Sequence, residues 1–128
     1  MSFDKTKYPF QEETFKIIGL CMEVHKTLGH GFLEIVYKDA LEIEFKKNEI
    51  AYEREKPFEI NYKGDILPHK YHADFIVFDR IILEVKAQSG LLAGHFKQSI
   101  NYLAASKCKI GLLINFGETS LKYNRIIL

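Results

Sequence analysis

The sequence predicts an α/β fold with a central mixed β-sheet flanked by helices. Apolar residues recur with helical spacing in two N-terminal segments and again near residue 100, whereas the period changes to two from Ile50 onward. A nearly continuous apolar run, KIGLLINF at 109–116, follows the third helical segment and is typical of a strand covered on both faces. A strand meander followed by a helical crossover to a buried strand implies a mixed sheet with helices packed on it.

Length and composition indicate one globular domain spanning residues 1–128. The chain is 47% hydrophobic and 27% charged, which is ordinary for a soluble domain with its own core. Residues 1–10 are expected to form a poorly ordered N-terminal arm. The net charge of +1 provides no global positive field, so any surface that binds nucleic acid must be local.

No segment resembles a signal peptide or a membrane span, and we expect a cytoplasmic protein without membrane contact. Cys21 and Cys108 form no CxxC pair and are expected to be free thiols, although a disulfide between them remains open. No His or Cys lies at zinc-ligand spacing or next to a base, so zinc chemistry and thiol catalysis are both discounted.

Two helices are expected first. Residues 12–28 carry an apolar stripe that comprises Phe15, Ile18, Met22 and His25 and is widened by Ile17, Leu20 and Val24. Gly29 and Gly31 then interrupt the chain. Residues 31–48 resume the helical spacing through Leu33, Val36, Tyr37, Ala40 and Leu41.

Strands follow from Ile50. Phe58, Ile60 and Tyr62 alternate with polar residues before a turn at 63–65, and YHADFIVFDRIILEVKA (71–87) supplies two strands around Asp79-Arg80. A third helix is expected at 93–107, with a core face of Phe96, Ile100 and Leu103. Residues 109–116 form the buried strand and 120–128 an edge strand. The predicted order is therefore α-α-β-β-β-α-β-β.

The hairpin at 71–87 holds Asp74, Glu84 and Lys86 among apolar residues. Alternate residues of a strand share a face, so Glu84 and Lys86 point the same way. A two-residue turn would pair Asp74 with Val85 and separate the two acids. We predict an odd-numbered connection, which places Asp74 opposite Glu84 or Lys86.

Two adjacent carboxylates repel each other and are costly to desolvate. A divalent cation such as Mg²⁺ or Mn²⁺ resolves the conflict, because it prefers hard oxygen ligands together with water and phosphate. The simpler interpretation, in which Lys86 pairs with Asp74 or Glu84 on a solvated face, remains open and is the commoner meaning of such spacing alone.

Two helices offer further polar residues. Glu34 lies at the shoulder of the packed face of its helix, whereas Lys38, Glu42 and Lys46 form the charged side. It is suited to reach a metal site, or to interact only with the helix dipole. Gln98 and Tyr102 share a face with His95 on the third helix, and this polar stripe faces either solvent or the site.

The chain resembles the GxxExxY proteins, a branch of the PD-(D/E)xK nuclease superfamily. GFLEIVY (31–37) matches the signature and ends the longer block VHKTLGHGFLEIVY, and three further blocks follow in the order and spacing of the family: YHADFIVFDRIILEVKA, HFKQSINYL and KIGLLINF. Ala73 stands where the name of the superfamily has Pro.

The resemblance implies a restriction-endonuclease-like fold. It implies that Asp74, Glu84 and Glu34 ligate Mg²⁺ or Mn²⁺, with the Val85 backbone carbonyl as a further ligand, and that Lys86 is the catalytic lysine. Gln98 and Tyr102 match a QxxxY motif that helps to hold substrate. Tyr37 and His95 complete the residues expected to position it.

The function these features favour is a metal-dependent nuclease that hydrolyses phosphodiester bonds in DNA. A non-catalytic nucleic-acid-binding or regulatory module that keeps the fold is the alternative, and a metal-binding measurement separates the two. A structure-specific nuclease such as a junction resolvase is a further alternative, since small domains of this superfamily often act as homodimers.

Overall fold

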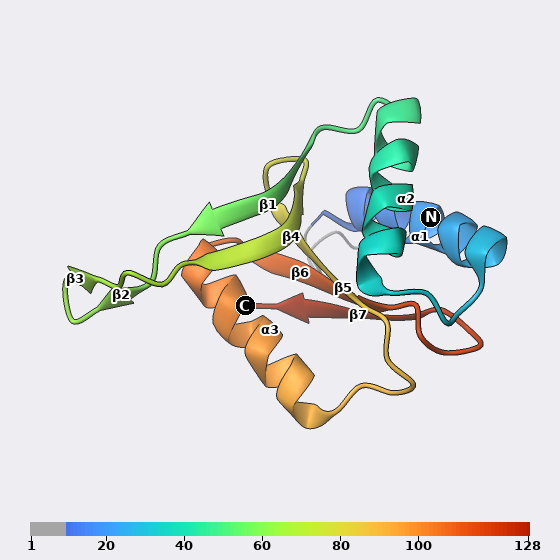
Figure 1. Cartoon of the computed structure of the whole chain (residues 1–128). Coiled ribbons are helices and arrows are strands. Elements are labelled where there is room, and N and C mark those ends of the chain that lie inside the picture. The colour runs from blue at the N-terminus through green and yellow to red at the C-terminus, as the bar shows by residue number, and fades with distance from the viewer. Residues whose placement is uncertain (1–9) are drawn as a thin grey trace, which may run out of the picture.

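A five-stranded β-sheet with helices on both faces organises the chain (Figure 1). The computed structural model describes residues 10–128. Its elements, in chain order, are α1 (Gln11–Leu28), α2 (Glu34–Lys47), β1 (Tyr52–Phe58), β2 (Asn61–Tyr62), β3 (Asp65–Ile66), β4 (Tyr71–Val77), β5 (Ile81–Lys86), α3 (Ala93–Ser106), β6 (Ile110–Asn115) and β7 (Lys122–Ile127).

The sheet is mixed, as predicted. Its five strands lie in the order β1-β4-β5-β6-β7. Only β5 and β6 pair in parallel, and α3 is the crossover between them, whereas the other neighbouring strands are antiparallel. β6 lies inside the sheet between β5 and β7, and its residues are buried throughout, which explains its continuous apolar sequence. The predicted edge strand corresponds to β7.

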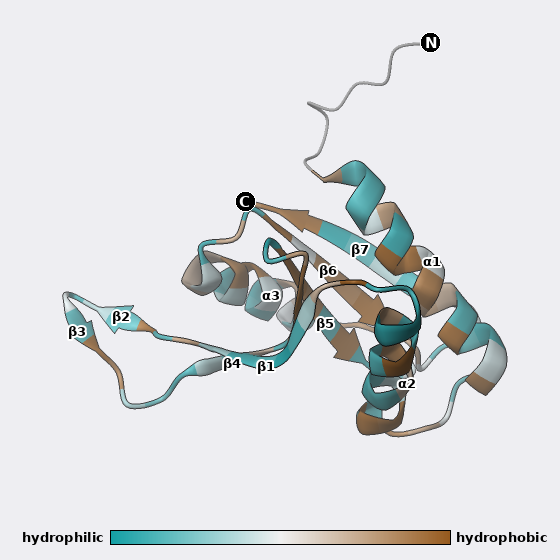
Figure 2. Ribbon diagram, turned by 90° about the horizontal axis from the view of Figure 1, so that it is seen from above, coloured by the Kyte–Doolittle hydropathy of each residue, from teal (hydrophilic) through white to brown (hydrophobic). Residues whose placement is uncertain are grey.

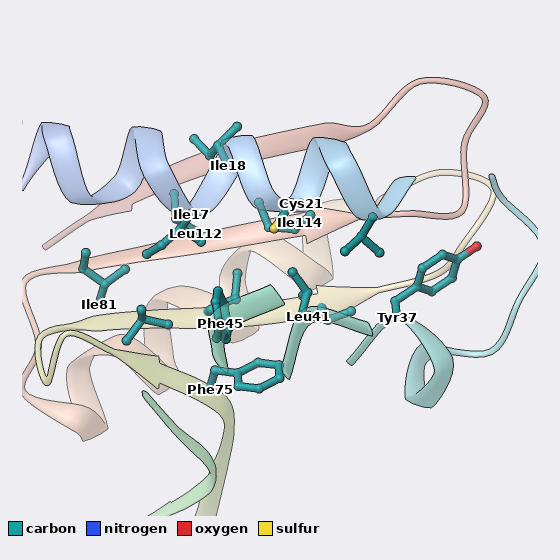
Figure 3. Packing of buried hydrophobic residues seen from close by; sticks show 14 of the residues in the cluster. Ile17, Ile18, Cys21, Tyr37, Leu41, Phe45, Phe75, Ile81, Leu112 and Ile114 are labelled. Carbon is teal, nitrogen blue, oxygen red and sulfur yellow. The ribbon is translucent and has the colours of Figure 1, made fainter. Parts of the chain in front are cut away.

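Two hydrophobic clusters fill the space between the sheet and the helices. The larger cluster joins α1 and α2 to the sheet through large buried side chains (Figure 3); its labelled members are Ile17, Ile18, Cys21, Tyr37, Leu41, Phe45, Phe75, Ile81, Leu112 and Ile114. The smaller cluster joins α3 to the other face through Leu103 and Tyr102, which pack with Tyr71 and Ile82. Side chains of α1 and α2 therefore cover one face, and those of α3 the other.

The connection between β4 and β5 has the predicted odd number of residues. Val77 pairs with Ile81, so three residues form the turn, and the ladder keeps this register back to Phe75. Continued by one position, the register places Asp74 opposite Glu84. The two acidic residues are thus brought together by the length of a turn.

The strand predicted through Phe58, Ile60 and Tyr62 differs in the structure. β1 occupies Tyr52–Phe58 and is the edge strand beside β4. The chain beyond it forms a separate two-stranded hairpin, β2 and β3, which turns at Gly64 with a φ of 92°. This hairpin projects from the body of the protein (Figures 1 and 2). Alternation alone did not reveal that only the earlier part joins the main sheet.

The buried faces of two helices differ from those predicted. In α1, Phe15 is 74% exposed and Met22 45% exposed, whereas Thr14 and Cys21 are buried. Apolar residues occur almost all around this helix, so spacing did not determine which side packs. In α3, Ile100 is likewise exposed, and the buried positions are Ser99, Leu103 and Ser106. Small serines allow α3 to lie close to the sheet.

Of the predicted N-terminal arm, residues 1–9 lie outside the described residues. Phe10 packs against the larger cluster, and the Arg80 guanidinium lies 4.8 Å from the centre of its ring. Cys21 and Cys108 are free, as expected. Among residues 10–128, none of the helices has the length and apolar composition that a membrane span requires.

Candidate active site

Asp74 and Glu84 meet where β4 stops pairing with β5. One oxygen of Asp74, Oδ2, accepts a hydrogen bond of 2.8 Å from the backbone N–H of Val85. This side-chain contact follows directly after the pair of Phe75 and Leu83, with which the ladder ends. The carboxyl groups of Asp74 and Glu84 also interact with each other. The strand end therefore holds two acidic side chains next to each other.

Glu84 is the more buried of the two acids, with 8% of its surface exposed. The Tyr71 hydroxyl donates a hydrogen bond to Oε1 of Glu84. Burial, and after it the negative charge of Asp74, raise the pKa of Glu84 from its ordinary 4.5 to about 8, although Tyr71 and the positive charge of Lys86 oppose the shift. At neutral pH the pair therefore retains a proton that an exposed glutamate would have lost.

Tyr71 is held in place by α3. The rings of Tyr71 and Tyr102 stack with centroids 4.0 Å apart and planes inclined by 12°. Tyr102 thereby supports the hydroxyl that contacts Glu84. Gln98, one turn earlier on the helix, is exposed. The structure brings Tyr102 to the edge of the acidic pair and leaves Gln98 at the surface of α3.

Lys86 and Val85 complete the end of β5. Lys86 is half-buried, and its backbone carbonyl accepts a hydrogen bond of 2.8 Å from the N–H of Phe116, next to β6. Successive residues of a strand direct their backbone groups to opposite sides. The carbonyl of Val85 therefore points away from β6, to the side on which its N–H binds Asp74. An uncharged backbone oxygen thus faces the acidic pair.

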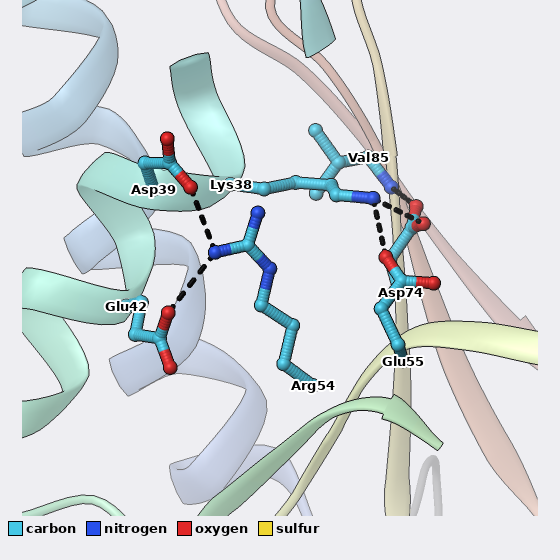
Figure 4. A network of polar contacts seen from close by, with 7 residues as sticks. All are labelled: Lys38, Asp39, Glu42, Arg54, Glu55, Asp74 and Val85. Carbon is cyan, nitrogen blue, oxygen red and sulfur yellow. Dashed lines mark hydrogen bonds and ion pairs between the residues drawn. The ribbon is translucent and has the colours of Figure 1, made fainter. Parts of the chain in front are cut away.

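Lys38 of α2 is a component of this site that the sequence did not reveal. Its Nζ lies 3.2 Å from Oδ1 of Asp74 and 2.6 Å from Oε1 of Glu55 on β1 (Figure 4). We had expected Lys38 on the charged outer side of its helix with Glu42 and Lys46. Helical spacing identified the packed side correctly near Tyr37, but it contained no information about how close α2 comes to β4.

Glu34 does not join the acidic pair. Within residues 10–128, no three side chains of the His, Cys, Asp and Glu types lie close enough together to hold a metal ion. Glu34 is the half-buried first residue of α2, one helical turn before Lys38. The α2 side chain that contacts Asp74 is that of Lys38, and a role of Glu34 as a metal ligand stays a prediction.

Tyr37 and His95, which are expected to position substrate, make structural contacts within the protein. Tyr37 is fully buried, its hydroxyl donates to the Gly29 carbonyl at 2.7 Å, and the same oxygen accepts from the N–H of Phe32 at 3.2 Å. It therefore fixes the loop that precedes α2. His95 accepts a hydrogen bond of 2.8 Å at Nδ1 from the N–H of Leu92 and so caps the start of α3.

Taken together, the mixed sheet, its helical layers and the acidic residues at the ends of adjacent strands define a restriction-endonuclease-like domain. A family model described as the PD-(D/E)XK nuclease superfamily matches residues 11–126. The chain therefore belongs to this superfamily, in agreement with the resemblance seen in its sequence.

The chain is also similar to a solved structure titled "Crystal structure of SSO0001", with 26% sequence identity and a TM-score of 0.59. The match covers 72% of this chain and 48% of that chain, so this chain corresponds to about half of the solved protein. No curated protein matches the chain.

Proposed function

We propose that the protein is a nuclease that hydrolyses phosphodiester bonds in DNA with Mg²⁺ or Mn²⁺ as its cofactor. The observation that carries this proposal is the placing of Asp74 and Glu84 next to each other at the strand end, where burial of Glu84, and after it the negative charge of Asp74, raise the pKa of Glu84 to about 8. Two carboxylates in one desolvated place are unfavourable unless a proton or a cation lies between them. Membership of the superfamily favours a cation over a proton in this place.

The donor atoms suit a hard divalent cation. Carboxylate oxygens of Asp74 and Glu84 and the carbonyl oxygen of Val85 are the ligand types that Mg²⁺ and Mn²⁺ prefer, with water and phosphate completing the shell. When bound there, the cation would activate water and stabilise the negative charge that develops on the phosphodiester. Glu34 would assist through a water molecule, because it is not part of the direct pair.

Lys86 is proposed as the catalytic lysine. It follows Glu84 by two positions on β5, so the two side chains lie on the same face of the strand, and its positive charge opposes the rise in the pKa of Glu84. An ammonium group there would orient the attacking water or hold the scissile phosphate. Tyr102 would keep Tyr71 against Glu84, and exposed Gln98 would contact the substrate.

The finer assignment to the GxxExxY branch is also proposed. It is supported by the sequence GFLEIVY and by the structure around it, in which Gly31 has a φ of 109° and the Tyr37 hydroxyl fixes the same loop. The motif would thus shape the turn that sets the start of α2, and with it the positions of Glu34 and Lys38 relative to the sheet.

The test is incubation of the protein with end-labelled single- and double-stranded DNA and RNA in Mn²⁺ and in Mg²⁺. Cleavage of DNA is expected for the wild type and loss of cleavage for Asp74→Asn and Lys86→Ala. Lys47→Ala, which removes a charge from the exposed end of α2, serves as the control and should cleave normally. Equal cleavage by all variants would identify a contaminating enzyme and overturn the proposal.

One observation favours the alternative of a binding module without turnover. Lys38 already neutralises Asp74, and no third acidic ligand joins the pair within the described part of the chain. This alternative predicts nucleic-acid binding that is independent of Mn²⁺ and no cleavage of any substrate in the panel. Light scattering on the same samples would show whether the protein acts as the homodimer proposed for junction-type substrates.

A further inference from the structure

Both oxygens of Asp74 are occupied by donors from the protein itself. Oδ2 accepts the Val85 N–H at 2.8 Å, and Oδ1 lies 3.2 Å from the Lys38 ammonium group. Val85 belongs to the same sheet and is fixed by it. Lys38 reaches in from α2 on a flexible side chain. Of the two donors, only Lys38 is able to leave without unfolding a strand.

The lysine is enclosed and remains charged. Only 12% of its side chain is exposed, compared with 16% for Asp74. Its ammonium group lies between two carboxylates, 2.6 Å from Glu55 and 3.2 Å from Asp74, and both negative charges favour its charged form. The positively charged Lys38 ammonium group therefore lies next to the Asp74 oxygen that a metal ion would need.

Glu55 offers this lysine a second partner in an unusual backbone position. It lies opposite Asp74, because Arg54 pairs with Phe75 and Lys56 with Ala73 on either side of it. Its φ of 56° is in the left-handed region, which is uncommon for residues other than glycine. The ladder omits this one pair. The Glu55 carboxylate is half exposed and already binds Lys38 at 2.6 Å, which is closer than Asp74.

The neighbouring cation, the guanidinium group of Arg54, binds other carboxylates. Nη1 of Arg54 lies 2.8 Å from Asp39 and 3.0 Å from Glu42, both on α2 (Figure 4). These contacts hold β1 against the helix and involve neither Asp74 nor Glu55. The two cations thus divide the surrounding carboxylates into a structural pair around Arg54 and a pair around Lys38 that includes a proposed metal ligand.

We propose that Lys38 is the resident counter-ion of Asp74, that a divalent cation displaces it, and that Glu55 retains the displaced ammonium group. The inference rests on the proposed function, because it requires the acidic pair to bind a metal ion. The Lys38 ammonium group and a metal ion bound to the same carboxylate oxygen would lie close together and repel each other strongly. Lys38 and the metal ion therefore compete for Asp74, and Glu55 lowers the barrier to exchange by offering the lysine a nearby partner.

The test measures Mn²⁺ affinity by calorimetric titration of the metal-free protein at near-physiological salt. Lys38→Met removes the competitor, so Mn²⁺ should bind more tightly, on the order of tenfold. Glu55→Gln leaves Lys38 with Asp74 as its only charged partner, so Mn²⁺ should bind more weakly, by about three- to tenfold. In the Lys38→Met background, Glu55→Gln should change the affinity less than about twofold, because Glu55 acts through the lysine.

Matched variants separate this effect from general charge. Lys47→Met removes a lysine from the same helix, and Glu53→Gln removes an exposed acid from the same strand whose own partner is Lys56. Both should leave Mn²⁺ affinity within about twofold, because exposed charges are screened beyond roughly 8 Å at this salt concentration. Lys38→Gln replaces Lys38→Met if circular dichroism shows that the latter variant does not fold.

The experiment distinguishes failure of the competition from failure of the proposed function. If the wild type binds Mn²⁺ and Asp74→Asn does not, but the affinities of Lys38→Met and Glu55→Gln equal that of the wild type, the competition is refuted and the metal site stands. If the wild type and Asp74→Asn both fail to bind Mn²⁺, the proposed function itself fails. Additive effects of the two substitutions in the double variant would refute the role of Glu55 as the retaining partner.

Discussion

The buried acidic pair should make the metal-free protein less stable as the pH rises, and Glu84→Gln should remove this effect. The raised pKa of Glu84 means that ionising it in the folded protein is unfavourable. A glutamine has nearly the same shape and is able to accept the hydrogen bond from Tyr71, but it cannot ionise. The substitution therefore tests the charge of the site without opening a cavity.

The magnitude follows from the pKa. The value rises from an ordinary 4.5 to about 8 in the folded protein. Between these pH values the folded state holds a proton that the unfolded state has released, so the free energy of unfolding falls as the pH increases. At roughly 1.4 kcal/mol for each pKa unit, the fall approaches about 5 kcal/mol above pH 8. That is a large part of a typical domain stability of roughly 5–15 kcal/mol.

The assay is urea unfolding in the presence of a chelator at several pH values from 4.5 to 9. Wild type and Glu84→Gln should have similar stability near pH 4.5, and the variant should become the more stable protein as the pH rises. Glu59→Gln, at an exposed position, should follow the wild type. If wild type and Glu84→Gln lose stability in parallel, the acidic pair does not carry the strain inferred from its burial. Mn²⁺ added at high pH should restore the wild type selectively, because it binds only the folded state.

Three further substitutions test how the surrounding structure supports the site. Gly117→Ala should lower the free energy of unfolding by about 1–3 kcal/mol or more, because a Cβ would lie 2.3 Å from backbone atoms of Gln88, whereas Gly111→Ala meets nothing nearer than 3.5 Å and should cost less; equal losses in urea unfolding would contradict this. Tyr37→Phe should cost about 1–3 kcal/mol in the same assay through its two lost hydrogen bonds, yet leave Mn²⁺ affinity unchanged, and a change in that affinity would show that the buried tyrosine belongs to the site. Tyr102→Phe keeps the stacked ring and should retain DNA cleavage, whereas Tyr102→Ala should lose most of it because the stack is gone; equal loss in both variants would assign the role to the hydroxyl.

Much of the fold followed from local pattern. The continuous apolar sequence of β6 reflects burial on both faces, and the helix before it fixes the parallel pairing with β5. The register of β4 and β5 was predicted because the alternative would have separated two acids that make sense only together. The apolar run, the helix before it and the length of the turn are all local patterns, so the sequence reveals them.

Other features depend on contacts between distant segments. α1 has apolar residues on most of its circumference, and only the position of the sheet decides that Cys21 is buried and Phe15 exposed. Similarly, Lys38 was expected on the solvated side of α2. Its contact with Asp74 arises because α2 packs close to β4, although the two residues are 36 positions apart in the sequence. No spacing within α2 reports that distance.

The motif residues divide in the same way. Asp74 and Glu84 were located by strand geometry and lie together. Tyr37 belongs to a recognisable motif, but both hydrogen bonds of its hydroxyl are made to the loop before α2. A pattern of residue types shows that a position is chemically special, whereas only the packing around it shows whether its polar atom faces a site or the interior.

The most direct measurement is a crystal structure of the protein grown with Mn²⁺, with the ion located by its anomalous scattering. We expect a peak bound by carboxylate oxygens of Asp74 and Glu84, with Lys38 displaced from Asp74 and bound to Glu55 alone. Asp74→Asn crystals should lack this peak. A well-ordered structure in saturating Mn²⁺ with no ion between these two acids, and with Lys38 still on Asp74, would contradict the assignment of a metal-dependent active site.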